Sequence, residues 1–317
     1  MSTLDKSVQE TVAGWLSAGE IDLFIGYEAG PLPLRATPLF VRRPEDVSRL
    51  IWDATCENNL VAFLPRYRDK KVGIMVKGCD SRAIIGLMQE KQVLRENLRI
   101  VGVSCPGIVD PKKVAARLDV PIEDLEDVFL DGEEILVGEA RIPLGETLYD
   151  MCRACTQHNP IVYDVRMGVE IADETPEDPF AHVHEMEKLS TDERWARFAG
   201  EMQRCNLCYA CRNACPLCYC NVCFVDRTTP RWFNQTAEPA DVQFYQIMRT
   251  FHLAGRCVGC GACTRACPQG IDLRLFLDKL RLDVRDLYGY EAGVDPEVLK
   301  APPLTTYREE DYNDFVM

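Results

Sequence analysis

The feature that most constrains this chain is a cysteine pattern that occurs twice in its C-terminal third. In each copy three cysteines stand three positions apart, a fourth follows four positions later, and a proline comes directly after it. The cysteines of the two copies are Cys205, Cys208, Cys211 and Cys215, then Cys257, Cys260, Cys263 and Cys267. Disulfide scaffolds are much smaller than this chain, whereas cysteines clustered in this way are typical of metal sites in a reducing compartment. The segment is therefore expected to fold around metal.

Each copy matches the bacterial ferredoxin pattern, in which three cysteines bind one [4Fe–4S] cluster and the fourth binds the other. The sequence predicts two such clusters with crossed ligands: Cys205, Cys208, Cys211 and Cys267 for cluster 1, and Cys257, Cys260, Cys263 and Cys215 for cluster 2. The alternative is zinc, which also binds four thiolates. A zinc site would use paired C-x2-C motifs and leave the third cysteine of each copy without a role, so the pattern favours iron–sulfur clusters.

Charge distinguishes this segment from the rest of the chain. The chain has 36 Lys and Arg against 50 Asp and Glu, a net charge of −14, which argues against a nucleic-acid partner because phosphates would be repelled. Residues 201–270 instead hold seven arginines, no lysine and four acids. An oxidised cluster with four thiolates carries a charge of about −2, so we expect these arginines to offset the clusters. A solvated basic face is the alternative.

Composition and the N-terminal residues indicate a globular protein without membrane insertion. The content of 47% hydrophobic and 27% charged residues is typical of a globular chain, and the length suits two domains. The sequence has no run of about 18 apolar residues that could form a membrane helix. Its first residues lack the basic and apolar regions of a secretion signal, so a cytoplasmic location is expected.

The N-terminal half alternates between helical and strand patterns. Pro44 and the two acids after it open a predicted helix that extends to Ala54. Residues 72–76 form a predicted buried strand, a helix capped at Asp80 or its neighbour follows, and residues 99–103 form the next strand. Strand, helix and strand at this spacing predict parallel pairing. The expected fold class is an α/β N-terminal domain with mainly parallel strands, followed by an α-helical dicluster ferredoxin-like module.

A stretch rich in proline and acids separates the two parts. The predicted organisation is an α/β domain at 1–172, a linker at 173–190, a two-cluster ferredoxin-type module at 191–290 and a C-terminal tail at 291–317. Ser190 with Glu193 three positions later matches a capping box, which predicts that a helix opens the module.

Four more cysteines belong to the α/β domain. Cys79 and Cys105 each follow a predicted parallel strand, and such strand ends lie at the edge of the sheet where α/β folds place their sites. Cys152 and Cys155 come later as a C-x2-C pair. On this pattern alone, the strand-end cysteines could be buried thiols and the pair a small zinc or redox site.

These cysteines lie in segments that resemble a known family. Residues 76–83 (VKGCDSRA), residues 101–105 (VGVSC) and the later pair are similar to the beta subunits of coenzyme F420-reducing hydrogenases and F420-linked formate dehydrogenases, over roughly residues 20–170. The resemblance implies that a third [4Fe–4S] cluster beside a flavin, with FAD as a candidate cofactor, is bound by Cys79, Cys105, Cys152 and Cys155. In that family a ferredoxin-like segment usually precedes this domain, whereas here it follows.

The ferredoxin pattern does not explain three cysteines just after the first run, Cys218, Cys220 and Cys223. They could replace Cys79 or Cys105 as ligands of the N-terminal cluster, bind a fourth cluster together with a cysteine further upstream (Cys56), or shield cluster sulfur. The sequence leaves these alternatives open.

With the dicluster module appended, the chain resembles the iron–sulfur subunits of heterodisulfide-reductase-like complexes. The resemblance implies a non-catalytic subunit that relays electrons between a dehydrogenase (hydrogenase, formate or NADH dehydrogenase) and a flavoprotein partner. One alternative is a flavin-dependent enzyme that acts on coenzyme F420 or NAD(P)H in its own α/β domain, and another is a structural metal-binding scaffold. No Walker loop, GxGxxG turn or Ser/His/Asp arrangement is present, so no catalytic residue is predicted.

Overall fold

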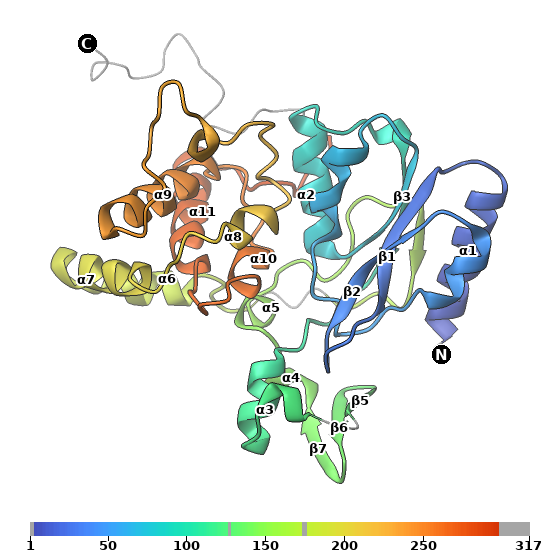
Figure 1. The fold of residues 1–317 in the computed structure, drawn as a ribbon. Helices are drawn as coiled ribbons and strands as arrows, with labels where there is room; N and C mark the ends of the chain where they lie inside the picture. The colour runs from blue at the N-terminus through green and yellow to red at the C-terminus, as the bar shows by residue number, and fades with distance from the viewer. Residues whose placement is uncertain (1–2, 126–127, 173–175, 298–317) are drawn as a thin grey trace.

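The computed structural model describes residues 3–125, 128–172 and 176–297 (Figure 1). A five-stranded sheet in the order β2-β1-β3-β4-β8 forms the N-terminal part. Its strands are β1 (Leu23–Ala29), β2 (Ala36–Val41), β3 (Val72–Val76), β4 (Leu98–Val103) and β8 (Val165–Met167). β1, β3, β4 and β8 run parallel, and β2 pairs antiparallel at the edge. The predicted α/β class with mainly parallel strands is confirmed.

The predicted βαβ unit is present around β3. This strand is apolar and buried along its whole length, because helices cover both faces of a parallel sheet. Helix α2 (Gly78–Gln89) follows at once and leads to β4, and the Asp80 carboxylate accepts a hydrogen bond of 3.2 Å from the Lys77 backbone N–H at the start of this helix. Helix α1 (Thr3–Ser17) lies on the opposite side of the sheet (Figure 1).

The helix predicted from Pro44 to Ala54 is shorter in the structure. It is a 3-10 helix, η1 (Pro44–Arg49), which ends where Leu50 adopts an extended backbone. Ile51 then pairs with Tyr27 in an isolated antiparallel bridge, with an N–H···O distance of 3.0 Å. These apolar residues therefore pack against the sheet instead of forming a helix face. Two further 3-10 helices are η2 (Leu60–Tyr67) and η3 (Arg95–Asn97).

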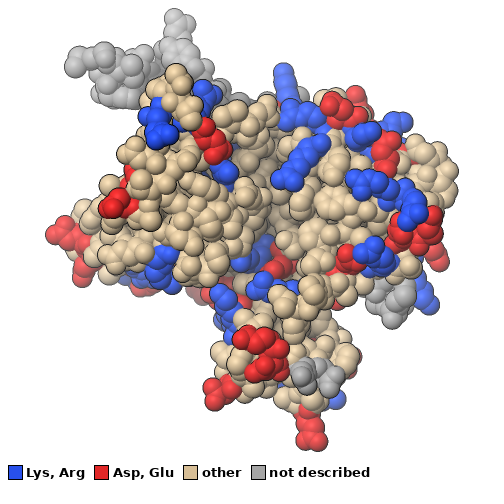
Figure 2. Space-filling view, in the orientation of Figure 1, with Lys and Arg blue, Asp and Glu red and all other residues tan. Residues whose placement is uncertain are grey.

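A small lobe that the sequence did not predict lies between β4 and β8. It comprises α3 (Pro111–Leu118), η4 (Ile122–Asp124), β5 (Val128–Asp131), β6 (Glu134–Val137), β7 (Ala140–Pro143) and α4 (Leu144–Thr147). The three strands form an antiparallel sheet, and Ile135 and Ile142 pack with Val114 of α3 in a separate core. The lobe projects from the rest of the molecule in Figure 1, and acidic side chains gather on it in Figure 2.

The C-terminal module is helical, as predicted. Its elements are α6 (Ala181–Glu187), α7 (Thr191–Met202), α8 (Ala210–Asn213), η5 (Phe224–Asp226), α9 (Pro239–His252), α10 (Ala262–Arg265) and α11 (Arg274–Tyr288). The capping box of Ser190 and Glu193 is present at the start of α7. Helix α9 separates the two cysteine runs and begins with a proline, which suits the first turn of a helix. The short helices α8 and α10 lie inside the runs and contact each other.

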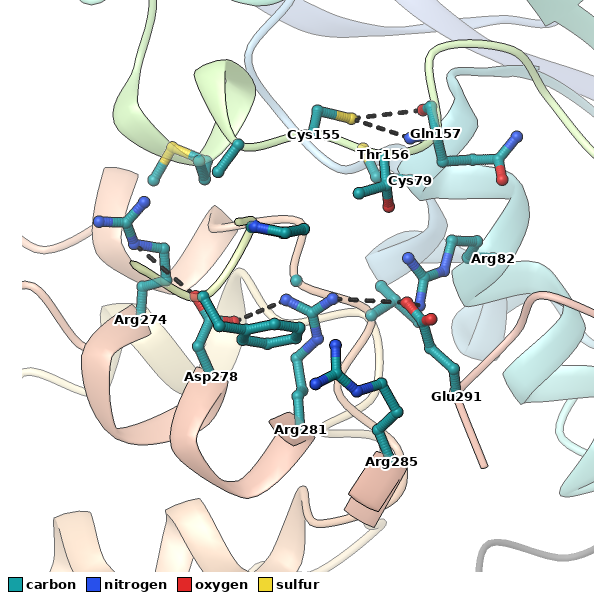
Figure 3. Close-up of a pocket in the computed structure, with 16 residues that line it drawn as sticks. Cys79, Arg82, Cys155, Thr156, Gln157, Arg274, Asp278, Arg281, Arg285 and Glu291 are labelled. Carbon is teal, nitrogen blue, oxygen red and sulfur yellow. Dashed lines mark hydrogen bonds and ion pairs between the residues drawn. The ribbon is translucent and has the colours of Figure 1, made fainter. Parts of the chain in front are cut away.

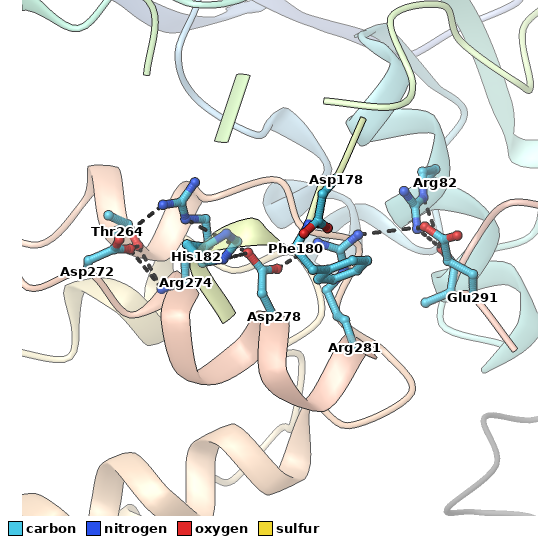
Figure 4. A network of polar contacts seen from close by, with 11 residues as sticks. Arg82, Asp178, Phe180, His182, Thr264, Asp272, Arg274, Asp278, Arg281 and Glu291 are labelled. Atoms are coloured by element: carbon cyan, nitrogen blue, oxygen red, sulfur yellow. Dashed lines mark hydrogen bonds and ion pairs between the residues drawn. The ribbon is translucent and has the colours of Figure 1, made fainter. Parts of the chain in front are cut away.

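A polar network joins the two parts of the molecule (Figure 4). Arg82 of α2 donates from Nε to the Ala292 carbonyl at 3.0 Å and pairs with Glu291 at 2.8 Å. Glu291 also lies 3.6 Å from Arg281 of α11, and Arg281 pairs with Asp278 at 2.6 Å. One hydrophobic core continues from the sheet to α9 and α11. The cysteine-bearing segments are therefore held against the N-terminal sheet.

The division into domains stays a prediction. The linker predicted at 173–190 contains α6, whose Val183 packs with Phe180 and with Leu282 of α11. The tail predicted at 291–317 lies outside the described residues from residue 298 onward. In the described ranges, no helix has the length and apolar character needed to cross a membrane.

Candidate metal centres

The second cysteine run winds around a small cavity. Its wall includes the four cysteines predicted to bind cluster 2, namely Cys215, Cys257, Cys260 and Cys263. The backbone N–H of Gly259 points at the sulfur of Cys257, and such bonds favour a thiolate. Burial nevertheless raises the pKa of Cys263 to about 12. A buried thiolate here needs a positively charged partner, and the four cysteines in this wall are the ones that the sequence predicts as ligands of cluster 2.

The backbone turns at matching positions in both runs. Gly259 and Gly261 have φ of +70° and +67° in the second run. Leu207 and Tyr209, at the same positions of the first run, have φ of +55° and +59°. Glycine adopts this left-handed conformation readily, but for Leu and Tyr it is strained, and such strain persists only where the surroundings impose it. The shared winding fits a chain that is held by its sulfur atoms.

The first run lies nearer the surface. Burial raises the pKa of Cys211, and the thiols of Cys205 and Cys267 raise it further. The Cys211 sulfur lies 3.8 Å from the Tyr245 hydroxyl on α9. Cys208 is exposed. Cys205 and Cys267 of the predicted cluster 1 are therefore both electrostatic neighbours of Cys211, while Cys208 is at the surface.

The four N-terminal cysteines meet at the C-terminal edge of the sheet. Cys79 follows β3, Cys105 follows β4, and Cys152 and Cys155 lie in and just after α5 (Asp150–Arg153). Burial raises the pKa of Cys105 to about 12, and the nearby thiols of Cys152 and Cys155 contribute to this. Burial also raises the pKa of Cys79, where Cys155 is again among the neighbouring groups. The parallel topology thus brings together the set implied by the family resemblance.

The three cysteine sets follow one another, with the second set in the middle. Burial is the main reason why the pKa values of Cys79 and Cys152 in the N-terminal set are raised, and Cys260 of the second run raises both further. Burial likewise raises the pKa of Cys263 in the second run, and Cys211 of the first run raises it further. The second set therefore has electrostatic neighbours on either side.

One buried arginine lies near each pair of neighbouring sets, and neither was predicted individually. Arg265 donates from Nη1 to the Cys260 carbonyl and from Nη2 to the Glu57 carbonyl, both at 2.7 Å. Arg249 donates from Nη2 to the Cys211 carbonyl at 3.1 Å. The arginine excess of this segment was the signal in the sequence, but it does not say which arginines are buried.

A buried lysine next to the N-terminal set was also missed. Lys77 Nζ lies 3.1 Å from the Asp80 carboxylate, with both side chains almost fully buried. It also donates to the Cys56 carbonyl at 3.1 Å and to the Tyr27 hydroxyl. Burial opposes the charge, but Asp80 and Tyr27 overcome this and raise the pKa of Lys77. A buried Lys77–Asp80 ion pair therefore stands beside Cys79, whose pKa burial and the Asp80 carboxylate raise and the Lys77 ammonium lowers.

The additional cysteines occupy different environments. Cys218 shares a thiol hydrogen bond with Cys215, which raises the pKa of Cys215 and lowers that of Cys218. Cys220 is exposed, Cys223 is partly buried, and Cys56 is buried in the N-terminal core. Their ligand roles stay predictions. Within the described part of the chain, no three His, Cys, Asp or Glu side chains are grouped as a single metal ion requires.

Two cavities border the cysteine sets. One of about 250 Å³ has Cys79 on its N-terminal side and Arg281 and Arg285 of α11 on the other (Figure 3). The second, of about 630 Å³, is lined by residues that include Tyr149 and Arg265. Both lie where the N-terminal part meets the helical module, so a molecule bound in either would be near two cysteine sets.

Known proteins provide an independent comparison. Residues 204–272 match the family described as a 4Fe-4S dicluster domain. The F420-dependent formate dehydrogenase subunit beta of Methanocaldococcus jannaschii is 24% identical, over 84% of this chain and 85% of its own. The F420-dependent formate dehydrogenase 1 subunit beta of Methanococcus maripaludis is 26% identical, over 91% of this chain and 89% of its own.

A solved structure of the F420-reducing [NiFe] hydrogenase complex from Methanosarcina barkeri contains a similar chain, with a TM-score of 0.38 and 16% identity. The match covers 48% of this chain and 59% of that one, less than two thirds of its length. The two formate dehydrogenase subunits, in contrast, match along most of the sequence. The chain is thus similar over most of its length to beta subunits of F420-dependent formate dehydrogenases, as its cysteine motifs predict, and its residues 204–272 are similar to 4Fe-4S dicluster domains.

Proposed function

We propose that this chain is an iron–sulfur electron-transfer subunit of a multi-subunit oxidoreductase. The observation that most supports this is the succession of three cysteine sets, because an electron relay needs neighbouring centres. The curated relatives are beta subunits of F420-dependent formate dehydrogenases, which supports a role as one subunit among several. Electrons would enter at one end of the succession and leave at the other.

The proposed ligands are the three sets of cysteines predicted from the sequence. Cluster 1 is bound by Cys205, Cys208, Cys211 and Cys267, cluster 2 by Cys257, Cys260, Cys263 and Cys215, and cluster 3 by Cys79, Cys105, Cys152 and Cys155. When bound, each cluster supplies one-electron chemistry. The chain positions the sulfurs through the left-handed turns, the strand ends and backbone N–H groups, and its buried cations offset the added negative charge.

The ends of the succession suggest where partners bind. Cys208 is exposed, so we place one partner against the first run. The N-terminal set is the other end of the succession, and the 250 Å³ cavity lies between this set and the helical module. The proposed partners are a dehydrogenase (hydrogenase, formate or NADH dehydrogenase) and a heterodisulfide-reductase-like flavoprotein, with residues 1–172 and 191–290 as the two domains of the relay.

Metal and flavin counts on anaerobically purified protein test the proposal. Three clusters require about twelve irons and twelve sulfides per chain, with electron paramagnetic resonance (EPR) signals after reduction by dithionite. A count of about eight irons per chain would support the two clusters of the dicluster module and contradict the third cluster. Stoichiometric zinc without reducible iron would overturn the relay itself.

A flavin-dependent enzyme is the second candidate, and the 630 Å³ cavity favours it. This cavity is of the size that binds small molecules, and Arg265 in its wall also contacts the Cys260 carbonyl of the second run. FAD bound there would be close to the relay. Stoichiometric FAD, together with turnover of coenzyme F420 or NAD(P)H by the isolated chain, would establish the enzyme. A flavin-free chain without such turnover would leave the relay as the function.

A further inference from the structure

Arg249 is a buried cation in an unusual environment. It lies on α9, the helix between the two cysteine runs, and its exposed fraction is 3%. Its Nη2 donates to the Cys211 carbonyl, but Nε and Nη1 have no hydrogen-bond partner among the described residues. Burying a guanidinium without partners is costly, so this side chain requires an acceptor that the protein part does not supply.

The groups that face Arg249 are sulfurs from both runs. Burial disfavours its charge, yet Cys263, Cys211, Cys218 and Cys215 together raise its pKa well above the ordinary value. In the described part of the chain no carboxylate pairs with it. Cys211 belongs to the proposed cluster 1, while Cys215 and Cys263 belong to the proposed cluster 2. The guanidinium is therefore near sulfurs of both proposed ligand sets.

We propose that Arg249 is a shared counter-cation of clusters 1 and 2, which donates its free N–H groups to sulfur and raises the reduction potentials of both. This inference rests on the two clusters of the proposed function. A fixed positive charge favours the reduced, more negative form of each centre. Because the guanidinium presents several donors in a planar fork, one side chain can serve two acceptors on different sides.

Arg265 provides an internal comparison. It contacts the Cys260 carbonyl, and Cys152, Cys260 and Cys79 are the thiols that raise its pKa against the effect of burial. It therefore faces the second and N-terminal sets, whereas Arg249 faces the first and second. If each arginine acts on the sulfurs that it faces, Arg265→Gln shifts cluster 2 and spares cluster 1, while Arg249→Gln shifts both.

The test is an EPR-monitored redox titration of the full-length protein and its Arg249→Gln and Arg249→Lys variants. Arg204→Gln is the matched control, since Arg204 is exposed and adjacent to Cys205. We expect unchanged iron content and a fall of both midpoint potentials in Arg249→Gln. The fall should be smaller in Arg249→Lys, which keeps the charge but loses the planar fork, and Arg204→Gln should match the wild type.

The outcomes separate this inference from the proposed function. A wild-type protein without reducible clusters refutes the proposed function. If the wild type holds both clusters, unchanged potentials in Arg249→Gln, or a shift of only one cluster, overturn the shared role. If Arg249→Gln fails to retain iron, Arg249→Lys decides: a small fall of both potentials supports the proposal, a fall of only one contradicts the shared role, and wild-type potentials contradict the hydrogen bonds to sulfur.

Discussion

The two cysteine runs share a pattern but differ in how the protein supports them. The second run turns through Gly259 and Gly261 and lies against the N-terminal part, with Met151 close to Gly261. The first run makes the same turns with Leu207 and Tyr209 and leaves Cys208 exposed. The backbone path is therefore common to both runs, while packing and exposure are not.

This difference assigns different roles to the two proposed clusters. The second set has cysteines of both other sets among its electrostatic neighbours and lies against α11, so we place it at the centre of the proposed relay. The first set meets the surface and is suited to exchange with a partner. Variants of the two runs can test this contrast between a central cluster 2 and a cluster 1 at the surface.

The largest effect is expected from removing one ligand of each run. Cys208→Ser and Cys260→Ser should each lose about four irons per chain. Because metal ligation contributes to folding, both variants should unfold at a lower temperature than the wild type. The unfolding temperature should fall further in Cys260→Ser, because this site is enclosed. Iron analysis and thermal unfolding under anaerobic conditions measure this. Equal destabilisation by both variants would contradict the contrast between the runs.

An ion cluster on α11 borders the cavity that the second run surrounds. Asp278 has an exposed fraction of 3%, and its partners include Arg281 at 2.6 Å and His182 at 3.0 Å. Asp278→Asn removes the nearer of the two carboxylates that pair with buried Arg281 and should cost about 3 kcal/mol of unfolding free energy. The matched control on the same helix is Asp283→Asn, a partly exposed ion pair with Lys279 that should cost at most about 1 kcal/mol. Urea unfolding compares the two.

The contribution of Asp278 should vanish in acid. Burial opposes its charge, but hydrogen bonds from His182 and Arg281 hold the pKa of Asp278 below its ordinary value. A lowered pKa adds stability above the unfolded-state pKa of about 3.9, and this is lost as the pH falls through the folded-state pKa. The stability difference between wild type and Asp278→Asn should therefore shrink below about pH 4. A difference that stays constant with pH would mean that the charge is not its cause.

A glycine in the second run should give a smaller effect. A Cβ added at Gly261 would lie 2.5 Å from Met151 Cε, and its φ of +67° is left-handed. Gly289, which ends α11 with φ of +59°, has no heavy atom within 4 Å of an added Cβ. In both alanine variants the left-handed backbone should lower the free energy of unfolding by about 1–2 kcal/mol. Gly261→Ala should lose roughly a further 1–3 kcal/mol through crowding.

Chemical unfolding of Gly261→Ala and Gly289→Ala, each with its iron content, measures the difference between them. If both variants lose the same stability, Met151 moves aside and the second run is less tightly enclosed than the contact suggests.

Sequence alone predicted the parts of this molecule that follow from local chemistry. The repeated cysteine spacing predicted the winding of residues 205–267, and strand polarity predicted that Cys79 and Cys105 share one edge. It missed the lobe between β4 and β8, whose short strands of only four residues carry little periodic signal. It also missed Arg249, because burial of an arginine depends on tertiary packing that no local pattern encodes.

The smallest expected effect concerns Cys218, which lies next to Cys215, the proposed fourth ligand of cluster 2. Its variant tests which of these two cysteines binds the cluster. Cys218 hydrogen-bonds to Cys215, whereas Cys220 is exposed two positions later. Without a cluster, Cys215 is the donor of this bond. If Cys215 binds cluster 2 as a thiolate it can only accept, and a hydrogen bond from the Cys218 thiol then stabilises the reduced form. Cys218→Ala should then keep all the iron and slightly lower the midpoint potential of cluster 2, and Cys220→Ala should change neither. Iron analysis with redox titration measures both quantities. Loss of about four irons in Cys218→Ala would instead make Cys218 a ligand, and Cys215→Ala would then retain the cluster.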